Sequence, residues 1–163
     1  MNWQIHIKGF KAFLQLEKSL SGNSVEAYVR DMTKLQQYIE MNFENPPSPE
    51  KINSKTLREF ISWISEIGLG AKSQARIVSG IRAFYKYLLI EDIIDDDPTV
   101  LLEVPRTERK LPDTLSNSEI VKMIDAIDLS KAEGARNRAI IETLYGCGLR
   151  VSELINLQIS NLH

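Results

Sequence analysis

Apolar residues recur at spacings of three and four along most of this chain, and no segment alternates apolar and polar residues as a half-buried strand would. The clearest stripe runs from Val25 to Ile39. Glycine and proline gather at a few points, so the pattern predicts helices separated by short loops. We therefore expect an all-α fold over these residues.

The same pattern predicts where each helix begins and ends. Pro46, Pro47 and Pro49 exclude a continuous helix at these residues, because proline lacks an amide donor and pushes its predecessor to extended geometry. The expected helices are Trp3–Lys18, a helix from the stop at Ser19–Gly22 to Met41, Ser54–Ile67, Ala71–Ile90, a short helix from Asp97 to Leu102, a helix capped by Ser116 and ending near Asp128, Ala135–Tyr145, and a further turn or helix from Arg150.

A linker is expected between two domains. Residues 103–112 contain two prolines and three cations, a composition typical of an extended connection, and we place the boundary near Pro105. The first four main helices then form a domain over residues 1–104. Residues 105–163 are expected to be part of a larger domain, since so few residues seldom bury enough apolar surface to be stable alone.

The charge distribution is more informative than the net charge. With 20 Lys and Arg against 22 Asp and Glu, the net charge of -2 would normally argue against a nucleic-acid partner. From Lys72 to Ile90, however, there are four basic residues and no acid, all four opposite the apolar face of the expected helix. A solvated polar face is the simpler interpretation of such a helix, but the absence of acids, together with the family resemblance described below, favours contacts with DNA. The candidate DNA-binding residues are Lys72, Ser73, Arg76, Ser79, Arg82 and Lys86, with weaker candidates Ser21, Ser24, Arg30 and Lys34 on the second helix.

Several classes of protein are excluded by composition. One cysteine cannot form an internal disulfide, and His6 and His163 are too far apart in sequence to suggest a metal site. No apolar run approaches the roughly 20 residues that span a bilayer, and no signal peptide follows Met1, so a cytoplasmic protein is expected.

Three stretches resemble the tyrosine recombinase (phage integrase) family, specifically its Xer-like branch. They are Leu20–Met32, then Arg82–Leu88 with Asp97–Thr99 and Leu111–Ser116, and finally Asn137–Leu154. The last contains Gly-Leu-Arg-Val-Ser-Glu-Leu at residues 148–154, which is the most specific of the signals. The departures are small: Asn137 stands where the family commonly has aspartate, and Asp97 where asparagine often precedes the proline.

The resemblance implies a helical core-binding domain with a SAM-like bundle over residues 1–104, and the first helices of an incomplete mixed α/β catalytic domain over residues 105–163. The two domains would form a C-shaped clamp on DNA. It further implies site-specific recombination by strand cleavage and rejoining through a 3′-phosphotyrosyl intermediate. The expected partners are a double-stranded recombination site and a homo- or hetero-tetramer of recombinase subunits, with no cofactor, metal, membrane or small-molecule substrate.

Arg150 matches the first catalytic arginine of the family. A guanidinium offers two parallel donors and a permanent charge to the oxygens of a phosphate under attack. Glu153, three residues later, is expected to support the arginine, with a solvated glutamate as the alternative. The family's nucleophile lies far downstream, so Tyr145 is expected in a core or interface. Cys147 is expected to be a small buried residue.

Residues 1–163 alone are therefore expected to bind DNA, to lack the nucleophile and to be inactive. Two alternatives stay open. One is a naturally shortened, DNA-binding regulator of a recombinase, and the other is a helical protein-interaction module without a DNA role.

Overall fold

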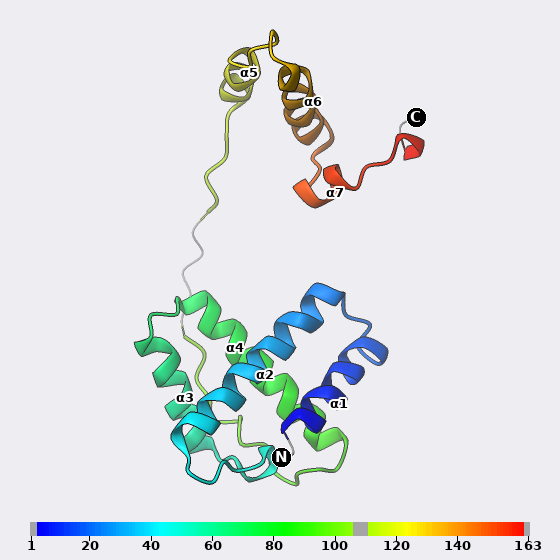
Figure 1. Cartoon of the computed structure of the whole chain (residues 1–163). Coiled ribbons are helices and arrows are strands. Elements are labelled where there is room, and N and C mark those ends of the chain that lie inside the picture. Colours follow the sequence, from blue (N-terminus) through cyan, green and yellow to red (C-terminus); the bar gives the residue numbers. More distant parts are fainter. Residues whose placement is uncertain (1–2, 106–110, 162–163) are drawn as a thin grey trace. The chain divides into compact units, whose positions relative to one another are not determined.

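The computed structural model describes residues 3–105 and 111–161, and it divides the chain into two compact units, residues 1–109 and 110–163 (Figure 1). Each unit is described by itself. No strand occurs in either described range, which confirms the expected all-α fold. The boundary expected at residues 104/105 stays a prediction.

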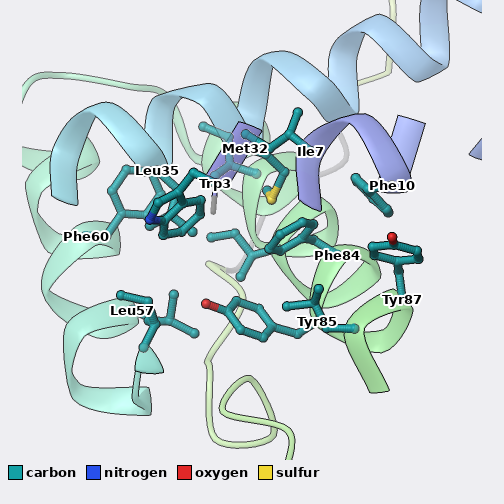
Figure 2. Close-up of a cluster of buried hydrophobic side chains, with 14 of the residues drawn as sticks. Trp3, Ile7, Phe10, Met32, Leu35, Leu57, Phe60, Phe84, Tyr85 and Tyr87 are labelled. Atoms are coloured by element: carbon teal, nitrogen blue, oxygen red, sulfur yellow. The ribbon is translucent and has the colours of Figure 1, made fainter. Parts of the chain in front are cut away.

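Four helices build the first unit: α1 (Trp3–Leu16), α2 (Gly22–Asn42), α3 (Ser54–Glu66) and α4 (Ala71–Ile90), with a 3-10 turn at Pro49–Lys51. Helix α4 is the central element, since it contacts each of the other three helices. Its apolar face is fully buried, as its spacing predicted, and it meets α1 in an aromatic cluster (Figure 2). The cluster includes Trp3, Phe10, Phe84, Tyr85 and Tyr87.

The proline-rich loop between α2 and α3 is anchored to the helices through main-chain oxygens. The Trp3 indole Nε1 donates to Pro47 O at 2.8 Å, and the buried Tyr85 hydroxyl donates to Pro49 O at 3.2 Å. His6 Nε2 lies 2.8 Å from Glu50 Oε1. These contacts fix a segment whose prolines lack main-chain donors and whose helical hydrogen bonds are limited to one 3-10 turn.

The prediction of a short helix from Asp97 to Leu102 is wrong, because this segment forms turns. Asp97 Oδ1 accepts hydrogen bonds from the Thr99 main-chain N–H at 2.8 Å and from its hydroxyl at 2.7 Å. Such local side-chain bonds compete with helical ones. Thr99 and Leu102 are nevertheless buried against the first unit.

Other differences from the expected boundaries are smaller. Helix α1 ends at Leu16 rather than Lys18, because the chain turns back through Ser19, at a φ of 48°, and the Leu20 N–H donates to Leu14 O at 3.1 Å. Helices α3 and α4 begin where the sequence predicted.

The second unit contains α5 (Asn117–Asp125), α6 (Ala132–Cys147), α7 (Val151–Ile155) and a 3-10 turn at Ile159–Asn161. Ser116 caps α5 in a capping box with Glu119, as expected. Helix α5 ends before Asp128, and α6 begins three residues before Ala135. Only Ile120 and Gly134 are buried among the described residues of this unit.

The last turn of α6 is open to solvent, which corrects the expectation for Cys147 and one of the two alternatives for Tyr145, whose interface role stays a prediction. Cys147 is exposed rather than buried. Tyr145 is 53% exposed and therefore lies outside any core in the described part of the chain. Its hydroxyl reaches Asn117 Oδ1 on α5 at 3.4 Å.

Within residues 3–105 and 111–161, no helix is both long and apolar enough to cross a membrane. No group of three or more metal-ligating side chains comes together there.

Candidate functional sites

Arg150 lies at the break between α6 and α7. Gly148 ends α6 in the left-handed conformation, at a φ of 63°, and a side chain would strain this position. Two residues later the backbone is extended, so Arg150 occupies the N-cap position of α7. Its side chain is 82% exposed. The loop therefore presents a permanent cation to solvent from a defined backbone position.

Glu153 accepts hydrogen bonds from both the main chain and the guanidinium of Arg150. One carboxylate oxygen accepts from the Arg150 main-chain N–H at 2.7 Å, and the other accepts from guanidinium Nη1 at 3.0 Å. These hydrogen bonds lower the pKa of Glu153, the main-chain bond most, so the carboxylate stays ionised at neutral pH. The expected contact is confirmed. The guanidinium keeps its other N–H groups for a ligand such as a phosphate oxygen.

The cationic face of α4 is exposed at its expected polar positions. Lys72, Ser73, Arg76, Ser79, Arg82 and Lys86 are all exposed. The Ser79 hydroxyl donates back to Ala75 O at 3.0 Å. Lys86 lies beside a shallow hollow of about 290 Å³ that also contacts Lys18 and Tyr28.

Two of the four α4 cations are held by the protein itself. Arg82 Nη2 donates to Leu102 O at 2.6 Å and so secures the turns that follow α4. Arg76 Nη1 forms an ion pair with Asp31 Oδ2 on α2. Lys72 and Lys86 make no ion pair with any described residue.

The α2 candidates divide into two groups. Arg30 and Lys34 lie close enough to the Asp31 carboxylate to favour its charged form, which places them around the Arg76 ion pair. Ser21 and Ser24 lie apart from this group, at the start of the helix, where Ser21 Oγ accepts from the Ser24 N–H at 3.4 Å. Arg30 and Lys34 therefore act electrostatically on the carboxylate with which Arg76 forms its ion pair.

Asp31 is the site residue that the sequence reasoning missed. It is 1% exposed and lies where α2 and α4 meet, since a Cβ on Gly80 of α4 would come within 3.2 Å of Asp31 Oδ2. One signal was available: Asp31 follows Tyr28 by three residues and precedes Leu35 by four, so it falls on the apolar stripe of α2.

Comparisons with known proteins match both units. Residues 7–92 match "Phage integrase, N-terminal SAM-like domain", and residues 113–163 match "Phage integrase family". Similar curated proteins include Tyrosine recombinase XerD of Staphylococcus haemolyticus (strain JCSC1435), 40% identical over 157 residues, and those of Staphylococcus aureus (strain Mu50) at 38% and Staphylococcus epidermidis (strain ATCC 35984) at 37%.

These matches cover 96% of this chain but 52% of each relative, so the chain spans about half the length of the curated relatives it matches. The SAM-like match covers the four-helix unit, and the second match contains the loop that carries Arg150. The chain belongs to the phage integrase family, among Xer-like tyrosine recombinases.

Proposed function

We propose that these residues serve site-specific DNA recombination, in which a protein containing them cleaves and rejoins DNA through a 3′-phosphotyrosyl intermediate. Arg150 stabilises the negative charge that develops on the scissile phosphate, and Glu153 orients it. The observation that carries this proposal is the exposed guanidinium, held by Glu153 at the α6–α7 break within the stretch that matches the family.

Residues 1–104 act as the DNA-binding domain, and residues 105–163 as the linker and the beginning of the catalytic domain. The acid-free face of α4, together with Arg30 and Lys34 of α2, contacts the phosphates of duplex DNA. On DNA the intact protein assembles as a homo- or hetero-tetramer, in the cytoplasm and without a cofactor. The 163-residue chain binds duplex DNA and does not cleave it.

The DNA-binding face is tested with charge reversals at Lys72 and Lys86, which make no ion pair within the part of the chain that the structure describes. Lys72→Glu and Lys86→Glu are expected to weaken duplex binding and to flatten the plot of log affinity against log salt by about 0.9 for each lost phosphate contact. Lys11→Glu is the matched control, since Lys11 is an exposed lysine on α1 that makes no ion pair with any described residue. If the α4 variants behave like the control, the face is only solvated. If the unaltered chain shows no saturable binding, the protein-interaction alternative is favoured.

The role of Arg150 is tested in a protein that continues beyond residue 163 and contains the nucleophile. Arg150→Ala is expected to reduce the covalent protein–DNA adduct by about 100-fold or more while leaving duplex affinity unchanged. Arg138→Ala is the control, because Arg138 is a surface arginine of α6 paired with Glu142 at 2.8 Å. Adduct formation at the original rate in Arg150→Ala would refute the role.

Sequencing the source gene beyond codon 163 separates the remaining alternatives. A continuing frame with a histidine-x-x-arginine motif and a late tyrosine supports an active recombinase. A stop codon there supports a DNA-binding regulator that retains Arg150.

A further inference from the structure

Asp31 is the one acidic or basic side chain buried within residues 3–105 and 111–161. Its Oδ2 accepts from Arg76, but its Oδ1 has no hydrogen-bond partner in the described structure. Gly80 of α4 leaves the space that this carboxylate occupies. The contact between α2 and α4 is thus built around a charged group, where an apolar residue would suit the surrounding core.

The ionised carboxylate is costly to the fold. Burial raises the pKa of Asp31 even though the Arg76 ion pair and the charges of Lys34 and Arg30 oppose the rise. A buried ion pair is often no more stabilising than a neutral replacement of similar size. Stability alone therefore does not account for the aspartate.

The ion pair with Asp31 orders the Arg76 side chain, whatever it contributes to stability. Its side chain is 46% exposed, and it would lose rotamer freedom if it had to be ordered by a ligand. The ion pair uses Nη1, and the remaining N–H groups have no partner among the described residues. Arg30 and Lys34 lie around the same carboxylate, so the ordered guanidinium belongs to a group of three cations.

We propose that Asp31 is a positioning residue, which holds the Arg76 guanidinium in advance in the orientation that binds a backbone phosphate of duplex DNA. This inference rests on the proposed DNA-binding function and assigns Asp31 a part in it. A simpler role would be charge neutralisation, in which Asp31 weakens the attraction of Arg76 for DNA. The two roles predict opposite changes in duplex affinity when the Asp31 charge is removed: positioning predicts weaker binding, and neutralisation predicts tighter binding.

The test compares duplex affinities of the whole chain at one salt concentration. Asp31→Asn removes a negative charge, yet positioning predicts binding about three- to tenfold weaker, the cost of ordering one long side chain on binding. Glu26→Gln is the matched control: it removes the same charge from an exposed position of α2 and is expected to leave affinity unchanged or slightly increased.

A double-mutant cycle separates positioning from a general structural effect. Arg76→Ala is expected to weaken binding, and adding Asp31→Asn to it should weaken binding no further, because the aspartate acts through the arginine. Burial raises the pKa of Asp31, so the fold disfavours the charged carboxylate, and the half-exposed Arg76 can be hydrated when its partner is neutral. Unfolding of the first unit, followed by the fluorescence of Trp3 and Trp63, should therefore occur at the same or a higher temperature in Asp31→Asn.

Each result decides between the roles. Weaker binding by Asp31→Asn at undiminished stability, abolished in the Arg76→Ala background, supports positioning. Tighter or unchanged binding overturns it in favour of neutralisation, and weaker binding that persists without Arg76 overturns it in favour of a structural role. If the unaltered chain does not bind duplex DNA, the proposed function itself fails.

Discussion

Helices α1 and α4 pack so closely at Gly9 that a side chain at this position would meet Tyr87 of α4. A Cβ at this position would overlap the Tyr87 hydroxyl. The ring of Tyr87 lies beside that of Phe10 (Figure 2), 5.7 Å away from centroid to centroid, and 5.3 Å from that of Phe13. Gly9→Ala gains about 1 kcal/mol of helix propensity but incurs an overpacking cost of about 1–3 kcal/mol. We expect a net loss of about 1 kcal/mol, or a melting temperature lower by roughly 4 °C.

The assay is thermal unfolding followed by tryptophan fluorescence. Both tryptophans, Trp3 and Trp63, lie in the first unit, so the signal reports that unit alone. In a Tyr87→Phe background the obstructing hydroxyl is gone, although the ring Cζ stays 3.3 Å from the added Cβ, so Gly9→Ala should lower the melting temperature less than it does in the unaltered chain. Gly22→Ala is the control, because a Cβ at Gly22 meets no atom within 4 Å. A higher melting temperature for Gly9→Ala alone would show that the helices are further apart than described.

Three further predictions concern hydrogen bonds and close packing elsewhere in the chain. Tyr85→Phe removes one of the two hydrogen bonds to Pro49 O, whose other donor is the Ile52 N–H, and should destabilise the first unit by about 1 kcal/mol, measured by the same fluorescence; an unchanged midpoint would contradict the bond. Hydrogen bonds from Ser116 lower the pKa of Glu119, so this pair stabilises the second unit above the ordinary glutamate pKa, and the contribution is lost as pH falls through the lowered value. Ser116→Ala should therefore raise the Glu119 pKa in an NMR titration, and an unshifted titration would exclude the bond. Gly134→Ala should increase amide exchange in the loop before α6, because a Cβ would overlap main-chain atoms there, and unchanged exchange would show that the loop has room.

The helices of the first unit could be predicted from sequence because each is determined by residues close together in the chain. Spacing and capping residues define α3 and α4, and their observed first residues match the expectation. The turns after α4 could not be predicted in the same way, because Pro98-Thr99 also suits a helix start and the outcome depends on the hydrogen bonds that Asp97 makes.

The candidate sites show the same division. Arg150 and Glu153 were predicted to meet because they are three residues apart at the start of a helix. The ion pair between Asp31 and Arg76 joins two helices, and the bond from Arg82 to Leu102 reaches a segment without periodic structure. Neither partner can be inferred from helical spacing, which specifies the face of a residue but not what lies opposite it.

The position of Arg150 depends on Gly148 keeping its left-handed backbone conformation, which L-amino acids rarely adopt and D-amino acids favour. An L-alanine there would be forced either to strain its main chain or to carry α6 further, and the second response would rotate the arginine away from its N-cap position. A D-alanine, introduced by chemical ligation, favours the same positive φ and should preserve the turn. The mirror-image residue is thus expected to keep the guanidinium where the natural glycine places it, while the ordinary one displaces it without touching any ligand.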